Sequence, residues 1–256
     1  MKNIEKFLVF ILQLFILIGC ADLDLQPTDM IAEDAVKKDP KLVEAFLTKI
    51  YANANFEPNE GRGYPNQDRL TDAVLGGEYT LMAPWQLGIQ ASTHVPTASG
   101  AHSRIAKFQY GNIRSTNEII EILNEASFDP QTVKEQIAEA KFLRAWMYFE
   151  MVKRYGGVPL ELEPKQVDAP VDELMIPRSS LKDCYDQIIA DLDAGIADLP
   201  PTAIAGKATS MAARALKSRA ALFAGRIAKY HPQSANGLTS IPASSAQAYY
   251  QMAHGA

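Results

Sequence analysis

The residues of this sequence that could carry catalysis are acids and histidines, and neither group falls into a catalytic motif. Thirty aspartates and glutamates offer many carboxylate pairs. Glycoside hydrolysis needs two of them about 5–10 Å apart, one with a raised pKa, and no spacing marks such a pair. His94 and His102 lie away from any HExxH or CxxC pattern. We therefore expect no enzyme activity, no metal site and no cofactor.

Cys20 is the residue with the most distinctive chemical context. Lys2 and Lys6 precede the almost wholly apolar run Phe7–Ile18, which is shorter than the about 20 residues that a membrane-crossing helix needs. The following Leu17-Ile18-Gly19-Cys20 resembles a bacterial lipobox, in which the cysteine takes a diacylglyceryl group. An ordinary signal peptide with an incidental cysteine is the alternative. We expect residues 1–19 to be a cleaved signal peptide and Cys20 to become an acylated, palmitate-bearing N-terminus.

The composition is that of a mildly acidic globular protein. The chain has 256 residues, 47% of them hydrophobic, and a formal net charge of −5, which is enough for one large domain or two small ones. Nucleic-acid binding needs clustered lysines and arginines, so we expect no nucleic-acid partner. With Cys20 acylated, Cys184 has no intrachain partner and is expected to be a small buried apolar residue.

Helical signals dominate the chain and predict an all-α fold. Asp39-Pro40 should begin one helix, and the capping box Thr132-Val-Lys-Glu135 should begin a long one that stops at Gly156-Gly157. Ser180-Leu-Lys-Asp183 should begin another helix, which Pro200-Pro201 stops. An alanine-rich helix is expected from about Ser210 to Tyr230.

Two similar segments hint at an internal repeat. Ala140-Lys-Phe-Leu-Arg-Ala and Ala213-Arg-Ala-Leu-Lys-Ser are about two tetratricopeptide periods of about 34 residues apart. Residues 53–102 break the pattern, because they are rich in proline and glycine without sustained periodicity. Long irregular segments of this kind are usually functional or disordered, so we expect a loop-rich insertion there.

Five segments behind Cys20 together carry a family resemblance. They are Asp22–Pro27, Ile113–Asn117, Glu139–Leu160, Pro177–Pro200 and Gly206–Leu216. In this order they resemble the SusD/RagB family, glycan-binding outer-membrane lipoproteins that sit on nutrient-uptake transporters. The resemblance implies a tetratricopeptide-like helical repeat superhelix with a long irregular loop insertion. It covers about the N-terminal half of a typical member, so we expect a C-terminally truncated fold, with a leader over 20–38 and an incomplete helical domain over 39–256.

The resemblance also implies a function. It predicts a lipid-anchored outer-membrane protein, exposed at the cell surface, that captures oligosaccharides or polysaccharides and delivers them to a SusC-like TonB-dependent transporter. A lipid-anchored helical-repeat adaptor for a protein or peptide is the alternative from a different class. A lipid-anchored hydrolase ranks below both for want of a catalytic constellation.

Sugar binding needs exposed aromatic rings for C–H faces and planar polar groups for hydroxyls. The insertion 53–102 supplies both, and we expect the ligand to contact Trp85, Tyr64, Tyr79, Asp68 and Arg69. Trp146 instead lies on the apolar stripe of a helix and is expected in the core. Arg144, Arg154 and Tyr155 belong to the best-matching segment, where we expect buried polar contacts between helices and a helix stop.

Overall fold

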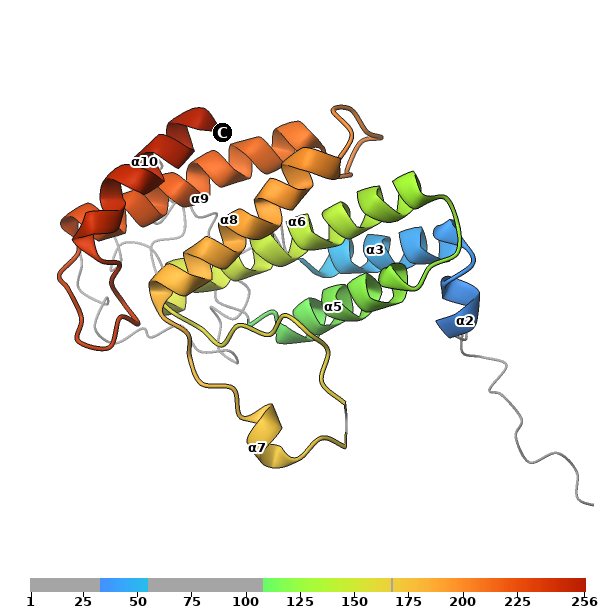
Figure 1. The fold of residues 1–256 in the computed structure, drawn as a ribbon, viewed down its shortest axis with the longest axis horizontal. Helices are drawn as coiled ribbons and strands as arrows, with labels where there is room; N and C mark the ends of the chain where they lie inside the picture. The colour runs from blue at the N-terminus through green and yellow to red at the C-terminus, as the bar shows by residue number, and fades with distance from the viewer. Residues whose placement is uncertain (1–32, 55–107, 167) are drawn as a thin grey trace, which may run out of the picture. The chain divides into compact units, whose positions relative to one another are not determined.

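The described part of this computed structural model is helical, as Figure 1 shows. The structure describes residues 33–54, 108–166 and 168–256, and these contain no strand. The elements are α2 (Glu33–Val36), α3 (Pro40–Asn53), α5 (Tyr110–Asn124), α6 (Pro130–Tyr155), α7 (Val171–Leu174), α8 (Leu181–Asp198), α9 (Ser210–Tyr230), the 3-10 turn η2 (Ala243–Ser245) and α10 (Ala246–Gly255). The compact unit begins at Asp34. The prediction of an all-α fold is confirmed.

Helix α6 is the centre of the compact unit. It packs against α3, α5 and α8. Helix α9 packs on α8, and α10 packs on α9 (Figure 1). Each of these longer helices therefore lies against its neighbour among them, the arrangement of helical-repeat proteins. The three largest fully buried side chains are Tyr148 and Phe149 of α6 and Tyr185 of α8.

Small residues of α9 allow the neighbouring helices, α10 among them, to pack closely against it. Ala220, Ala221 and Ala224 of α9 are fully buried. A Cβ added at Gly225 would lie 3.0 Å from the ring of Tyr250 on α10. Larger side chains at these positions would push the helices apart, because cores are packed as densely as organic crystals. The alanine-rich helix has the limits predicted from the sequence.

Aspartate–proline pairs begin two of the helices. The Asp39 side chain accepts a hydrogen bond from the backbone N–H of Lys41 at 2.9 Å, as predicted. The predicted start of α6 is wrong: the N-cap is Asp129, which accepts from the backbone N–H of Thr132 at 2.8 Å. Pro130 suits the first helical position because that position needs no N–H donor. Helix α8 begins at its predicted cap, where the hydroxyl of Ser180 accepts from the Asp183 N–H at 3.1 Å.

The Gly156-Gly157 pair ends α6 by allowing close backbone contact. Gly156 has a φ of 72°, in the left-handed region that other residues adopt at a cost. A Cβ there would lie 2.3 Å from the carbonyl oxygen of Leu238, and one on Gly157 would lie 2.1 Å from that of Ser179. The Gly157 N–H also donates to the Leu238 carbonyl at 2.6 Å. The predicted helix stop is confirmed, and any side chain at Gly157 would displace backbone.

Arg144 joins three helices through buried polar contacts, as expected. Its guanidinium binds both carboxylate oxygens of Asp191 on α8, at 2.8 and 2.7 Å, and donates to the Asn117 side chain on α5 at 2.8 Å. Asn117 in turn donates to the backbone carbonyl of Glu161 at 2.9 Å. Arg154 is different, because it pairs with Glu150 within α6.

Two further expectations for single residues are confirmed. The Trp146 ring packs against the core, and its indole N–H donates to the Ala54 carbonyl at 3.1 Å. Cys184 is fully buried and free, with its sulfur 3.4 Å from the Val158 backbone nitrogen. None of the helices in the described ranges has the length and apolar character to cross a membrane.

Candidate functional site

The residues predicted to contact a ligand lie outside the described part of the chain. Trp85, Tyr64, Tyr79, Asp68 and Arg69 fall between residues 54 and 108, and Cys20 precedes residue 33. Their roles as ligand contacts and as the acylation site stay predictions. The site geometry below therefore comes from the helical unit.

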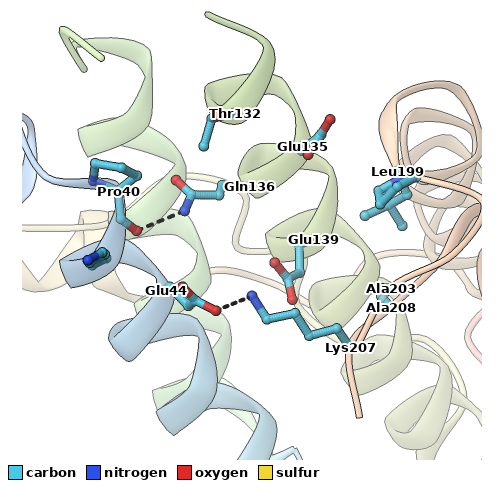
Figure 2. Close-up of a pocket in the computed structure, with 12 residues that line it drawn as sticks. Pro40, Glu44, Thr132, Glu135, Gln136, Glu139, Leu199, Ala203, Lys207 and Ala208 are labelled. Atoms are coloured by element: carbon cyan, nitrogen blue, oxygen red, sulfur yellow. Dashed lines mark hydrogen bonds and ion pairs between the residues drawn. The ribbon is translucent and has the colours of Figure 1, made fainter. Parts of the chain in front are cut away.

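One cleft lies where α3, α6 and the segment joining α8 to α9 meet (Figure 2). Its volume is about 260 Å³. It is lined by Pro40, Lys41, Glu44, Thr132, Glu135, Gln136, Glu139, Leu199, Pro200, Ala203, Lys207 and Ala208. Three glutamates against two lysines make the cleft mildly acidic.

Polar contacts tie the α8–α9 segment to α3 across this cleft. The Lys207 ammonium lies 2.6 Å from a carboxylate oxygen of Glu44, and the Ala208 N–H donates to the Tyr51 hydroxyl at 2.8 Å. The Gln136 side chain on α6 donates to the Pro40 carbonyl at 2.9 Å (Figure 2). These bonds fix the cleft walls relative to one another.

Glu139 is the electrostatically unusual residue of the cleft. Its side chain is 7% exposed, and burial raises the pKa of its carboxyl; the Tyr51 hydroxyl and the charge of Lys207 act in the opposite direction. Its Oε1 has no hydrogen-bond partner, and neither does the Oε1 of Gln136. Burial favours the neutral acid because a charge loses its hydration there.

This geometry argues against the cleft as a hydrolase site. A general acid must reach the leaving oxygen of the substrate, but Glu139 Oε1 is buried and Tyr51 already bonds the carboxyl group. Glu44, the neighbouring acid, is neutralised by Lys207. Across the described ranges no three His, Cys, Asp or Glu side chains gather closely enough to hold a metal ion. The polar side chains of the cleft therefore serve mainly to hold the α8–α9 segment against α3.

A second, larger cavity lies between α6, α8 and α9. Its volume is about 470 Å³, and its lining combines cationic and aromatic groups: Lys153, Tyr185, Phe223, Arg226, Ile227, Tyr230 and His231. Sequence analysis missed it, because Tyr185 follows the apolar periodicity of its helix. A signal existed in the run Leu222-Phe-Ala-Gly-Arg226, which places an aromatic residue and an arginine about one turn apart on α9.

Comparison with known proteins places the chain in context. The sequence model of a SusD-like family, described as "Starch-binding associating with outer membrane", matches residues 23–222. SusD-like protein P2 of Formosa agariphila is 26% identical over 216 residues, which are 80% of this chain and 41% of the relative. A SusD-like protein of Bacteroides ovatus is 27% identical over 225 residues, 84% of this chain and 38% of the relative.

Solved structures share the helical arrangement. A SusD-like protein of Bacteroides fragilis superposes with a TM-score of 0.55 and 28% identity, covering 79% of this chain and 38% of that one. A laminarin-binding SusD-like protein superposes with a TM-score of 0.58 and 23% identity, covering 85% and 44%. The chain thus spans about two fifths of the length of the curated relatives it matches.

Proposed function

This chain belongs to the SusD-like family, and from that membership we propose that it captures oligosaccharides at the outer membrane. The observation that carries the proposal is the family match over residues 23–222. The laminarin-binding SusD-like protein that superposes on this chain supports a carbohydrate as the ligand class.

We assign the sugar contacts to the insertion 53–102. Trp85, Tyr64 and Tyr79 supply rings for C–H faces, and Asp68 and Arg69 supply planar polar groups. The bound sugar is then delivered to a SusC-like TonB-dependent transporter. Cys20 is the acylated residue that holds the protein at the outer membrane and at the cell surface.

Affinity electrophoresis of the purified chain against a panel of soluble glycans, laminarin among them, tests the function. We expect at least one glycan to retard the chain, and Trp85→Ala to abolish the retardation. Phe46→Ala is the matched control, because it removes an exposed ring from α3 outside the insertion. Binding retained in Trp85→Ala would overturn the assignment of that residue alone.

Failure to bind any glycan would overturn the proposed function itself. A pull-down from outer-membrane extract separates the two classes of partner. Recovery of a TonB-dependent channel supports delivery to a transporter. Recovery of one soluble protein, together with no glycan binding, supports a helical-repeat adaptor instead.

A further inference from the structure

The cavity between α6, α8 and α9 is lined by exposed side chains of α9. They are Phe223, Arg226 and Tyr230. The Tyr185 side chain on α8 also forms part of the lining, but it is 0% exposed and its hydroxyl is buried out of reach of a ligand. The side chains of α6 and α9 must therefore supply the ligand contacts.

The cavity is positively charged, although the chain as a whole is acidic. Lys153 and Arg226 line it and supply this charge. Lys153 and Arg154 share one acid, Glu150. In the described part of the chain, Arg226 forms no ion pair. The positive charge is therefore only partly neutralised.

Other positive charges lie near Lys153. The pKa of its ammonium is lowered mainly by burial; Glu150 acts in the opposite direction, and repulsion from Arg154 and Arg219 adds to the lowering. The C-terminal end of α9 lies beside the cavity, and its partial negative charge opposes anion binding. Side chains rather than backbone groups must therefore attract an anion here. An anionic ligand would relieve the repulsion among these cations.

Aromatic rings supply the apolar side of the cavity. Phe223 is 40% exposed and Tyr230 is 69% exposed, and both line it. Exposed rings beside charged groups suit a ligand that has C–H faces as well as polar substituents. The volume of about 470 Å³ falls within the range of about 300–1,000 Å³ that is usual for small-ligand pockets.

We propose that this cavity binds an acidic sugar residue, with its carboxylate or sulfate ester close to Lys153 and Arg226. The sugar ring packs against Phe223 and Tyr230. This inference rests on the proposed function and narrows the ligand class to glycans that carry negative charge. It also gives the helical unit a ligand contact separate from the insertion 53–102.

Matched polymer pairs test the charge requirement by affinity electrophoresis and titration calorimetry. One pair is polygalacturonate and its methyl ester, and the other is dextran sulfate and dextran. We expect the acidic member of at least one pair to bind at least about tenfold more tightly than its neutral counterpart. The pair that responds identifies the anion as a carboxylate or a sulfate ester. Equal affinity within both pairs, or no binding of either acidic polymer, overturns the proposal.

Arg226→Gln tests the site itself. Loss of one hydrogen bond to a charged ligand should weaken binding of the responding acidic polymer about tenfold. Arg226 is exposed, so the melting temperature of the variant should be unchanged. Arg214→Gln is the matched control, because it makes the same charge change on α9 about 18 Å along the helix, and it should keep wild-type affinity. Wild-type affinity in Arg226→Gln overturns the assigned site.

The outcome for neutral glycans separates this inference from the proposed function. Binding of a neutral glycan that depends on Trp85, with no binding of acidic polymers, overturns the cavity assignment and leaves the function standing. If no glycan of either kind binds, both fail.

Discussion

Arg144 shows how a single residue can fix the positions of three helices. Its ion pair with Asp191 is deeply buried, with side chains 7% and 3% exposed. Five N–H donors in a planar fork allow one guanidinium to bind Asp191 and Asn117 together, which lysine cannot do. Gln187 adds a further donor to Asp191 at 3.1 Å. Loss of either charged partner would leave a buried charge without compensation.

We therefore expect Arg144→Met to lower the free energy of unfolding by about 3–5 kcal/mol, measured by urea denaturation. The double variant Arg144→Met, Asp191→Leu should regain much of this loss, because no buried charge then remains unpaired. Arg114→Met is the control, since its pair with Glu118 is partly exposed, and it should cost about 1 kcal/mol or less. A single variant as stable as the wild type would contradict this role of Arg144.

Glu139 gives a prediction with a definite dependence on pH. Its carboxyl pKa is raised in the fold, mainly by burial. The folded state therefore binds the proton more tightly than the unfolded state does, and the stabilisation is fully present below the ordinary value of 4.5. It is lost as pH rises from there through the folded pKa.

Glu139→Gln keeps the shape of the side chain and removes the ionisation. We expect the variant and the wild type to melt at similar temperatures near pH 4, and the variant to melt at the higher temperature near pH 8. Differential scanning calorimetry across this range measures the difference. A constant difference between the two proteins at every pH would show that Glu139 ionises in the fold as it does in the unfolded chain.

At the residue scale, the burial of a side chain could be predicted from the pattern of its own helix, whereas a site formed by side chains of several helices could not. The apolar setting of Cys184 and Trp146 follows from the helical periodicity around each residue, and the structure confirms it. Arg226 lies on the exposed face of its helix, but its importance comes from Lys153 and Tyr185 on two other helices, which line the same cavity. Neighbours of that kind depend on tertiary packing, which a single sequence does not specify by spacing.

At the element scale, helix limits follow from capping and stop signals where one signal acts alone. Ser180 begins α8, and Gly156 ends α6, each as predicted. The predicted start of α6 is wrong because two capping signals fall within seven residues, from Asp129 to Glu135. The capping box pointed to Thr132, but Asp129 followed by Pro130 acts one turn earlier and adds three residues to the helix.

This correction predicts different effects for two alanine variants. Asp129→Ala removes the acceptor for the Thr132 N–H and hydroxyl and should lower the melting temperature by about 2–4 °C. Glu135→Ala should leave it nearly unchanged, because Glu135 only accepts an exposed hydrogen bond from Gln131 within the helix. Circular dichroism melts of both variants provide the test. The opposite ranking would restore Thr132 as the cap.

At the scale of the whole molecule, the sequence indicated the class and the family before the packing was known. Neighbouring helices along the chain lie together in the structure, so local helical signals determine much of the arrangement. The family match spans residues 23–222. This range includes most of the predicted leader, all of the predicted insertion and most of the helical unit. Charge is distributed unevenly over this unit, because the cleft near Glu139 is acidic and the cavity near Arg226 is basic.

The attachment of the molecule to a membrane is tested at its two cysteines. Cys20→Ser removes the predicted acylation site, and Cys184→Ala removes the other thiol, which is fully buried. Stable anchoring needs two or more acyl chains, so we expect Cys20→Ser to lose palmitate label and to leave the membrane fraction. Cys184→Ala should keep both the label and the membrane location, because a buried thiol on α8 has no access to a lipid donor. Label retained in Cys20→Ser, or lost in Cys184→Ala, would contradict Cys20 as the single acylation site, whereas the outer-membrane proposal would still rest on the family match.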